Sequence, residues 1–459
     1  MKHGKTSIAD HRRPLLSRRQ MLRQILGTSL SLPLGSRLAG ALLQGQNPAA
    51  PANSTAAANP GPITTLSAED DQFLNDVESA SFQFFWEQGS PNTGMVKDRC
   101  NLRNPNQISA ASIAATGFGL TALCIGDQRK FIPSAAALER VFATLRFLWR
   151  KLPNHRGFFF HFAHPETGER MYDSEVSSVD TAILLCGLIS CREHFRHRAV
   201  AELANLILNR VDWTWLAEDT SLLTHGWTPE VGFLSSRWDY YSELMMMYLL
   251  AMGAAQRPLP ADIWNAWKRL TFEYDGMRYI GSFAPLFVHQ YSQAWFDFRN
   301  KRDKYADYFQ NSITATEVHR RFCLELRQQF PDYSEELWGI TASDSQHGYV
   351  VWGGPPAMGP IDGTVVPSAA GGSLPFLPAE ALRVLKAMRS KYPSSWTKYG
   401  FVNAFNPLKN WYDSDVIGID TGIVLLMAEN LRTGFVWDTF MRSAEAKRGM
   451  EKAGFQKTT

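Results

Sequence analysis

The stretch SSVDTAILLCG, Ser177 to Gly187, shows most directly how this chain folds. From Ala182 onward it contains only apolar and small residues, so a helix built from it has no polar face to turn toward water. The segment Ala110–Ala122 is likewise dominated by small and apolar residues. Because such helices are stable only where they are covered on every side, both are predicted to lie in the interior of a larger helical assembly.

The rest of the chain from Leu66 onward predicts helices that cover this interior, with little strand signal. Ala135–Lys151 and Pro378–Lys391 are amphipathic, as outer helices are. The expected helices are Ala68–Gln88, Ile108–Ile125, Ala135–Lys151, Ser174–Cys191, Arg198–Ala217, Asp239–Gly253, Pro260–Phe272, Leu286–Phe298, Tyr305–Phe330, Leu377–Lys391 and Ile417–Thr433, with a short one near Tyr333. Alternating buried and amphipathic helices predict an all-α toroid, although a globular α-bundle has similar periodicity. The loops of a toroid form a funnel at one end.

The first 66 residues differ in composition from the rest. Arg18 and Arg19 precede the weakly apolar run Ile25–Leu43, which is typical of a twin-arginine (Tat-type) export signal; the alternative is a basic disordered tail. Pro33 and Arg37 interrupt that run, so stable membrane insertion is not expected. The predicted organisation is a signal peptide at 1–44, a disordered linker at 45–66, one domain at 67–445 and a C-terminal tail at 446–459. The protein is expected to be periplasmic or secreted.

Charge and cysteine content exclude some classes of function. The chain of 459 residues has a net charge of +3. Residues 1–66 contribute eight Lys or Arg and one Asp, which leaves 39 basic and 43 acidic residues in the remainder. This acidic remainder gives no indication of nucleic-acid binding. The five cysteines form no CxxC pair, so buried thiols rather than disulfides are expected. A monomer is expected.

The first carboxylate-bearing segment is Tyr172–Thr181. Asp173 or Ser174 is predicted to cap the helix that follows, with Glu175 in its first turn. Asp180 precedes an apolar helix, and a buried Asp requires either a charged or hydrogen-bonding partner or a catalytic role. The residues alone leave both readings of Asp180 open.

Two further segments place carboxylates before apolar helices. Asp239 and Glu243 are four residues apart, so they are predicted to share a helix face, and burial would raise the pKa of Glu243 as a general acid requires. The alternative is a capping Asp239 with Glu243 paired to a base. In the third segment, Asp413 and Asp415 precede Asp420 and a second apolar run. They could cap that helix or bind a cation, but the spacing of a calcium loop is absent, so no metal site is predicted.

Aromatic side chains gather in the loops and in one polar run. Trp411 and Tyr412 lie among turn-forming residues, and the run Phe287–Arg299 includes His289, Gln290 and Trp295. Such side chains both stack on flat apolar faces and form hydrogen bonds, which is the mixture that a sugar requires. Aromatic loops on a helical scaffold therefore predict a glycan-binding cleft.

Several long motifs resemble the bacterial glycoamylase-like family, which includes endo-β-1,2-glucanases. They are SSVDTAILLCG, WDYYSE, LFVHQYSQAWFDFRNKRD, DGTVVPSAAGGSLPF, GFVNAFNP and WYDSDVIGIDTG. The resemblance extends over nearly all of residues 70–440 and implies an (α/α)6 toroid of inner and outer helices with an acidic cleft and no cofactor. It also implies that Glu243 is the general acid, that Asp420 or Asp415 is the base, and that Glu175 is a further active-site carboxylate. Gln293 and Thr421 stand where relatives carry His and Gln, which is expected to alter a subsite.

The sequence therefore predicts a glycoside hydrolase that cleaves a β-glucan, foremost an inverting endo-β-1,2-glucanase acting on an oligo- or polysaccharide. The predicted catalytic residues are Glu243, Asp420, Glu175, Asp180 and Asp415. The predicted substrate-binding residues are Asp98, Arg99, Trp238, Asp239, Tyr241, His289, Gln290, Trp295, Trp411 and Tyr412. The alternatives are a transglycosylase or lyase acting on another glycan, and a non-catalytic periplasmic glycan-binding protein.

Overall fold

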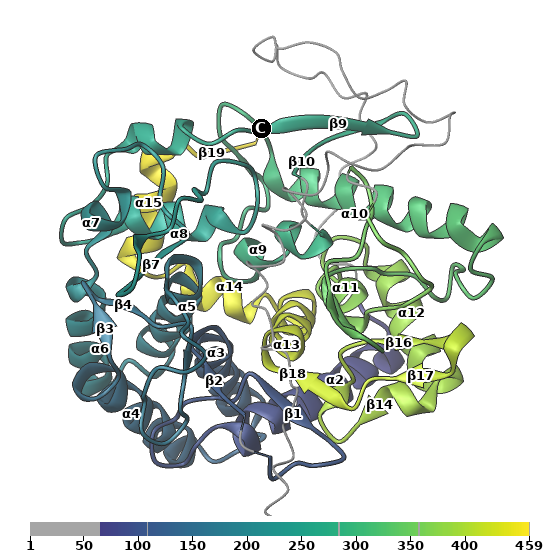
Figure 1. Cartoon of the computed structure of the whole chain (residues 1–459), viewed down its shortest axis with the longest axis horizontal. Helices are drawn as coiled ribbons and strands as arrows, with labels where there is room; N and C mark the ends of the chain where they lie inside the picture. The colour runs from purple at the N-terminus through teal and green to yellow at the C-terminus, as the bar shows by residue number, and fades with distance from the viewer. Residues whose placement is uncertain (1–64, 108, 283–284, 357–358, 459) are drawn as a thin grey trace, which may run out of the picture.

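Two concentric rings of helices form the body of the protein (Figure 1). The computed structural model describes residues 65–107, 109–282, 285–356 and 359–458. The inner ring consists of α3 (Ile113–Arg129), α5 (Ser178–Phe195), α8 (Leu244–Gly253), α9 (Tyr291–Trp295), α11 (Pro367–Gly371) and α13 (Gly418–Arg432). Around it lie α2 (Ala68–Gln88), α4 (Ser134–Arg150), α6 (Arg198–Arg210), α10 (Tyr308–Glu325), α12 (Pro378–Lys391) and α15 (Ala444–Lys452), with the short helices α7 (Trp213–Ala217) and α14 (Phe435–Phe440). The predicted all-α toroid is confirmed.

The inner helices are apolar because other helices surround them. In α3 and α5 every residue is buried except those in the last turn. These two helices approach so closely that a Cβ added to Gly187 would lie 2.0 Å from the carbonyl oxygen of Gly117. Only glycine fits there, because a real Cβ cannot come so near to a backbone atom. The outer helix α4, by contrast, buries one stripe, from Ala137 through Val141 to Leu148.

The ring closes where the last inner helix, α13, packs beside the first helix, α2 (Figure 1). A buried charge cluster marks this contact. Glu78 and Glu429 are 0% exposed, and they pair with Arg432 at 2.6 Å and with Arg129 at 2.7 Å respectively. Because buried charges are stable only when they are paired, this cluster fixes the register of α2, α3 and α13.

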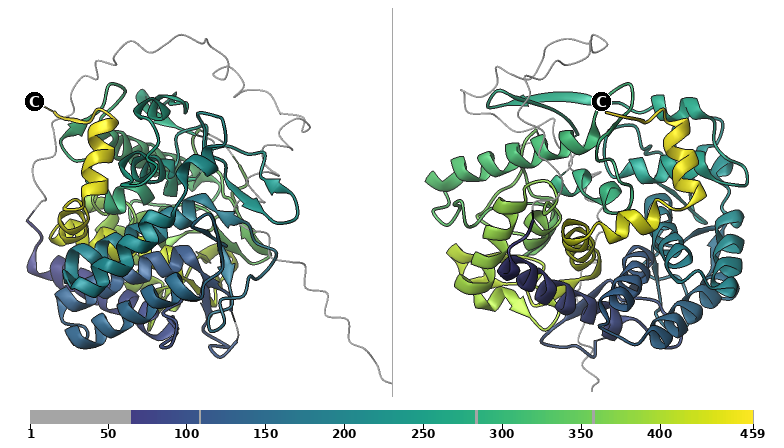
Figure 2. Two further views of the ribbon diagram at one scale, coloured as in Figure 1. Left: turned by 90° about the vertical axis from the view of Figure 1, so that its left-hand side faces the viewer. Right: turned by 180° about the vertical axis from the view of Figure 1, so that it is seen from behind.

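Short antiparallel strands connect the loops between the helices, and the last strand of the chain lies beside α15 (Figure 2). The strands are β1 (Arg99–Asn101), β2 (Ala111–Ser112), β3 (Asn154–His155), β4 (Phe158–Phe159), β5 (Phe162–Ala163), β6 (Val176–Ser177), β7 (Gly226–Thr228), β8 (Gly232–Phe233), β9 (Leu270–Tyr274), β10 (Met277–Gly281), β11 (Lys301–Arg302), β12 (Ser343–Ser345), β13 (Gly348–Val350), β14 (Trp396–Thr397), β15 (Gly400–Phe401), β16 (Phe405–Asn406), β17 (Trp411–Tyr412), β18 (Asp415–Ile417) and β19 (Gln456–Lys457). The pair of β1 with β18 joins segments over 300 residues apart, and β6, β7 and β8 form one sheet. These pairs hold the loops of the funnel in place.

Several predicted elements are corrected by the structure. The helix predicted at Pro260–Phe272 is instead a 3-10 turn, Ala261–Asn265, followed by β9. Burial alternates along β9 with the period of a strand. Arg198–Ala217 divides into α6 and α7, because Asp212 caps the second helix through its side chain. The short helix near Tyr333 is an extended bridge between Ser334 and Leu337.

Helix caps were predicted with mixed success. Ser67 caps α2, since its hydroxyl accepts a hydrogen bond from the amide of Asp70. The prediction that Asp173 or Ser174 caps α5 is wrong. Ser177 is the cap, and Glu175 lies before strand β6 rather than in the first turn of the helix. Glu175 is thereby placed on a strand edge and not on the helix.

The predicted domain boundaries, residues 67 and 445, can be compared with the described fold. The predicted signal peptide and nearly all of the predicted linker lie outside the described residues. The boundary predicted at residue 445 falls inside α15, and Met450 and Gly449 on that helix are buried against α8. Strand β19 then pairs with β11, so the described fold continues through Lys457. Among the described residues, no helix has the length and apolar character needed to cross a membrane.

Candidate active site

A cavity of about 430 Å3 opens at the funnel end of the toroid. That volume falls within the range of roughly 300–1,000 Å3 typical of ligand pockets. Carboxylates are prominent in its wall: Asp98, Asp180, Glu243, Asp344, Asp413, Asp415 and Asp420. The aromatic and imidazole side chains that line it are His161, Phe162, Tyr172, His225, Trp238, Phe287, Tyr291 and Tyr349. The helices α3, α5, α8 and α13 begin beside this cavity, and the partial positive charge of their N-terminal ends stabilises its carboxylates.

Glu243 occupies the N-cap of α8, a helix in which every residue is buried. It is therefore the polar residue at the N-terminal end of an apolar helix, and it lines the cavity. Ser292 fixes this end of the helix: its hydroxyl donates to the carbonyl oxygen of Glu243 at 2.9 Å and accepts from the amide of Met246 at 3.1 Å. Asp239 precedes the helix, so the prediction that it shares a helix face with Glu243 is wrong. Burial raises the pKa of Asp239.

Trp238 forms one wall of the cavity near the start of α8. Its ring stacks on His225 with 4.1 Å between centroids and 20° between planes. Its indole Nε1 donates to the hydroxyl of Ser178 at 2.9 Å. The ring is 7% exposed, so it is held firmly while one part of it reaches the cavity. A fixed aromatic wall of this kind suits an apolar sugar face.

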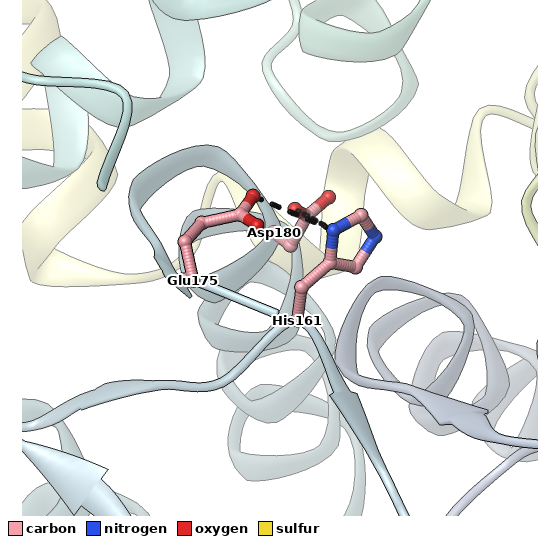
Figure 3. A group of neighbouring side chains, drawn as sticks. All are labelled: His161, Glu175 and Asp180. Carbon is pink, nitrogen blue, oxygen red and sulfur yellow. Dashed lines mark ion pairs between the residues drawn. The ribbon is translucent and has the colours of Figure 1, made fainter. Parts of the chain in front are cut away.

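His161, Glu175 and Asp180 form a cluster at the start of α5, in which the three side chains point toward one another (Figure 3). Nδ1 of His161 lies 3.5 Å from Oε1 of Glu175 and 3.6 Å from Oδ2 of Asp180. The hydroxyl of Ser177 donates to the same Oδ2 of Asp180. Asp180 therefore has partners and also lines the cavity, so both readings left open by the sequence apply to it.

Asp420 lies in the first turn of α13 and is 7% exposed. The hydroxyl of Ser368 donates to its Oδ1 at 3.2 Å, and the amide of Asn403 donates to its Oδ2 at 2.8 Å. Ser368 comes from the neighbouring inner helix α11, and Asn403 from the segment before β16. Asp420 is thus oriented by donors to each of its carboxylate oxygens, and it faces the cavity.

Arg99 on β1 gathers three aspartates on another wall of the cavity. Its guanidinium lies 2.6 Å from Asp344, 3.3 Å from Asp415 and 3.1 Å from Asp98. Asp415 also accepts from the amide of Asn101 at 2.6 Å. The pairing of β1 with β18 brings Arg99 and Asp415 together, and a cross-ring contact adds Asp344. Burial raises the pKa of Asp344, and the charge of Arg99 opposes that rise.

Asp413 is the most perturbed carboxyl of this group. Burial, reinforced by the negative charge of Asp344, raises its pKa to about 8. Its side chain accepts a hydrogen bond from the amide of Asp415 at 3.0 Å through Oδ1. Its Oδ2 is buried and has no hydrogen-bond partner in the described part of the chain. Asp413 is therefore mostly protonated at neutral pH, so it adds little negative charge to the group of aspartates around Arg99.

Two groups of side chains have the geometry to hold a cation. One is His161, Glu175 and Asp180, and the other is Asp344, Asp413 and Asp415; in each, the potential ligand atoms lie within 4.8 Å of one another. In the second group the guanidinium of Arg99 already supplies positive charge to Asp344 and Asp415. In the first group the imidazole lies between the carboxylates. The sequence predicts no metal at either position, and that expectation stays a prediction.

The predicted substrate-binding residues separate into two sets. Asp98, Arg99 and Trp238 line the cavity. The others do not: Asp239, Tyr241, His289, Gln290, Trp295, Trp411 and Tyr412. Among these, Tyr241 contacts Nδ1 of His289 at 3.1 Å, Gln290 donates to Ser373 at 2.9 Å, and Trp295 donates to Thr121 at 3.0 Å. These contacts lie in the core. Side chains with polar and apolar parts can form hydrogen bonds to other core residues as well as to a ligand.

His289 illustrates this correction. It is 6% exposed, and burial lowers its pKa to about 3. It is therefore a neutral core imidazole. Gln293, which was expected to alter a subsite, is 1% exposed and donates to Ser312 at 2.6 Å, so this departure from the family lies in the core. Thr421 is 6% exposed and is absent from the cavity lining.

Sequence reasoning missed several cavity residues. His161, Asp344, His225, Tyr172 and Tyr349 carry no motif that marks them, since each reaches the cavity through a loop or a hairpin. Tyr349 lies on the hairpin of β12 and β13, in a stretch where Tyr and Trp mix with turn-forming glycines and prolines, and that composition is the one available signal. The position of Asp344 depends on a contact with Arg99 across 245 residues, which no local pattern reveals.

A family described as “Putative glucoamylase” matches residues 235–444 of this chain. A curated relative, the exo β-1,2-glucooligosaccharide sophorohydrolase (non-reducing end) of Parabacteroides distasonis, is 28% identical over 429 residues, which cover 85% of this chain. The chain spans 58% of the length of that relative. The resemblance to the glycoamylase-like family is confirmed.

Solved structures support the same family and the (α/α)6 toroid. The endo-β-1,2-glucanase of Chitinophaga pinensis, in complex with sophorotriose and glucose, matches with a TM-score of 0.79 and 27% identity, covering 85% of this chain and 99% of that one. A β-1,2-glucanase of Parabacteroides distasonis matches with a TM-score of 0.78 and 26% identity, covering 84% of this chain and 60% of that one. The predicted (α/α)6 fold is confirmed.

Proposed function

We propose that this chain is a glycoside hydrolase that cleaves β-1,2-linked glucan. The observation that carries the proposal is the cavity wall: Glu243 at the mouth of an apolar helix shares one sugar-sized pocket with oriented aspartates and fixed aromatic rings. Glycoside hydrolysis requires two carboxyl groups on opposite sides of the scissile bond, one as an acid and one as a base. The relatives named above act on β-1,2-linked glucans, which supports that linkage.

Glu243 is the proposed general acid. It stands at the N-terminal end of an apolar helix and lines the cavity, where a carboxyl group can donate a proton to the leaving oxygen of a bound glycan. Its backbone is fixed through Ser292, so the carboxyl group starts from a defined point. A general acid placed in this way contributes about 100- to 10,000-fold to the rate.

Asp420 is the proposed base, in preference to Asp415. Ser368 and Asn403 orient both oxygens of Asp420 by hydrogen bonds. Asp415 instead pairs with the guanidinium of Arg99 at 3.3 Å, so its carboxylate is already engaged by a cation. We propose that Asp420 activates the attacking water, directly or through a substrate hydroxyl, so that the anomeric configuration inverts. Asp180 and His161 line the cavity and orient the substrate, whereas the predicted catalytic residue Glu175 is absent from the lining and positions His161 at 3.5 Å. Arg99 organises another wall.

The proposed action is endo, on chains rather than on disaccharides. The cavity carries aromatic residues on several walls, among them Trp238 and Tyr349. A chain of sugars can bind to such a series of rings on both sides of the scissile bond. The curated relative is an exo enzyme, so an analysis of product size decides between the two modes.

Two other activities are less well supported. A lyase acts on uronic acids and needs positive charge to neutralise them, whereas Arg99 here is already engaged by three aspartates. A non-catalytic glycan-binding protein would need the aromatic rings but not the oriented carboxylates. Lyase products absorb ultraviolet light, transglycosylation lengthens chains, and a binding protein releases no reducing ends, so each alternative has its own signature.

The proposed location is periplasmic or secreted, through the Tat-type signal at residues 1–44. A fusion of these residues to a reporter that must fold before export should appear outside the cytoplasm. Replacement of Arg18 and Arg19 by Lys should keep that reporter inside, because the twin arginine is the feature that such signals share. Export that is unaffected by the double replacement would overturn this proposal.

The test of the proposed function is the release of reducing sugar from soluble β-1,2-, β-1,3- and β-1,4-glucans and from starch. We expect release from β-1,2-glucan alone, with products of several lengths and of inverted anomeric configuration by NMR. Release from a different glucan would overturn the linkage, and retention of configuration would overturn the mechanism.

A further inference from the structure

The rim of the cavity carries an aromatic side chain that neither the core nor the proposed chemistry uses. Tyr172 is 62% exposed, yet it lines the cavity. Scattered exposed apolar residues are normal on a protein surface, and exposure alone indicates nothing. The combination of exposure with a place at the mouth of the active-site cavity is what distinguishes Tyr172 from Val231, which is 72% exposed and absent from the cavity lining.

The backbone beneath Tyr172 adopts an unfavourable conformation. Tyr172 and Asp173 have φ values of 59° and 47°, so two successive residues other than glycine occupy the left-handed region. Such residues persist only where the surrounding structure holds them, and they concentrate at functional sites. A bulky Tyr in this conformation is rarer than Asn or Asp, which makes the choice of side chain at position 172 informative.

Arg170 is the group that holds this turn. Its Nε donates to the carbonyl oxygen of Ser174 at 2.7 Å, and its Nη2 donates to the carbonyl oxygen of Asp173 at 2.7 Å. The same guanidinium pairs with both carboxylate oxygens of Glu230, at 2.6 Å and 3.0 Å. Arg170 thus ties the strained turn to the neighbouring turn between β7 and β8. The ring of Tyr172 is consequently presented from a fixed base rather than from a free loop.

A continuous row of rings leads from the His161 cluster to Tyr172. The ring of His161 stacks on Phe162 with 3.9 Å between centroids and 13° between planes. Phe162 in turn meets the ring of Tyr172 edge-on, with 5.7 Å between centroids. All three line the cavity, and His161 contacts Glu175 and Asp180 at its inner end. The row therefore runs from the carboxylates to the solvent.

We propose that Tyr172 is the stacking platform of an outer subsite, which binds a glucosyl unit of a β-1,2-linked chain beyond the units held in the cavity. This inference rests on the proposed function and adds to it that polymeric chains are preferred over the shortest oligosaccharides. A sugar ring presents an apolar face that packs on a Tyr ring, and the partly exposed ring remains available for it. The proposal assigns Tyr172 to substrate binding and Arg170 to the positioning of Tyr172.

The test compares catalytic efficiency on a size-graded series of β-1,2-gluco-oligosaccharides with efficiency on the polymer. In Tyr172→Ala, the ratio of kcat/KM on the polymer to kcat/KM on the shortest cleaved oligosaccharide should fall roughly 2- to 10-fold, the range expected for one aromatic contact. The loss should lie in KM rather than in kcat, because stacking outside the reacting centre binds the ground state and the transition state alike. Tyr172→Phe should keep the ratio, since it keeps the ring.

Matched variants separate binding from structure. Val231→Ala shortens another exposed apolar side chain, which is absent from the cavity lining, and should behave as the wild type. Arg170→Gln frees the turn and should lower the same ratio as Tyr172→Ala. An unchanged ratio in Tyr172→Ala, in an enzyme that cleaves β-1,2-glucan, overturns the subsite and leaves the proposed function standing. A wild-type protein that neither cleaves nor binds any member of the series, as measured by calorimetry, overturns both.

Discussion

Replacement of Asp413 by Asn should change the way in which stability depends on pH. Burial and the charge of Asp344 raise the pKa of Asp413 to about 8 in the folded protein, from an ordinary value of 3.8. Between these values the folded state holds a proton on Asp413 that the unfolded state has released. Unfolding therefore releases one proton, and the wild-type protein loses stability as the pH rises through this window.

The magnitude follows from that single proton. One proton corresponds to about 1.4 kcal/mol per pH unit, so between pH 5 and pH 7 the wild type should lose roughly 2–3 kcal/mol of unfolding free energy from Asp413. Asn has no proton to release, and it keeps the acceptor for the amide of Asp415. The stability of Asp413→Asn minus that of the wild type should therefore rise by this amount over the same range.

Urea unfolding at a series of pH values measures this difference directly. Other titrating groups cancel, because they are common to both proteins. Asp362→Asn is a matched control. Burial raises the pKa of Asp362, but hydrogen bonds from Lys409 and Thr364 outweigh burial and lower that pKa. Asp362 is therefore ionised in both the folded and the unfolded state across pH 5–7. Its difference from the wild type should be flat there. A flat difference for Asp413→Asn as well would refute the assignment of a neutral buried carboxyl to this site.

Three further substitutions test the scaffold and the base. Arg129→Met removes a partner of Glu429 at the closure of the ring and should cost about 3 kcal/mol of unfolding free energy in urea melts, whereas Arg198→Met at an exposed pair should leave the urea midpoint unchanged. Gly187→Ala places a Cβ 2.0 Å from a backbone oxygen of α3, so the melting temperature should drop or the protein should fail to fold; a wild-type melting curve would contradict the close contact of α3 and α5. Asp420→Asn should lower kcat on β-1,2-glucan by at least about 100-fold with an unchanged far-ultraviolet circular dichroism spectrum, and a rate near that of the wild type would remove Asp420 as the base.

The helical rings could be predicted because their information is local. The apolar runs at Ala182–Gly187 and Leu244–Leu250 leave no polar face, so their burial follows from composition. Elements whose form depends on distant partners could not be predicted. The inner helix Pro367–Gly371 is five residues long and rich in small side chains, and the β1–β18 pair joins segments over 300 residues apart. Neither leaves a periodic signal in the sequence.

The site divides along the same line. Glu243, Asp180 and Asp420 could be located because each precedes an apolar helix, and the structure places all three at the cavity. The aromatic run from Phe287 to Arg299 predicts substrate contacts that the fold does not make, because His289, Gln290 and Trp295 are buried in the core. The polar atoms of such a side chain in an inner helix form hydrogen bonds inside the toroid as readily as they would with a ligand. The sequence cannot tell the two apart where the residues on the neighbouring helices are unknown.

The most direct test of the central claim is the hydrolysis of β-1,2-glucan by Glu243→Gln beside the wild type. The amide occupies the same position at the mouth of α8 but cannot donate the proton that the leaving oxygen needs. Reducing-sugar release should fall about 100- to 10,000-fold, while calorimetry shows that the glucan still binds. Release by Glu243→Gln at the rate of the wild type would contradict the assignment of the general acid and, with it, the proposed mechanism.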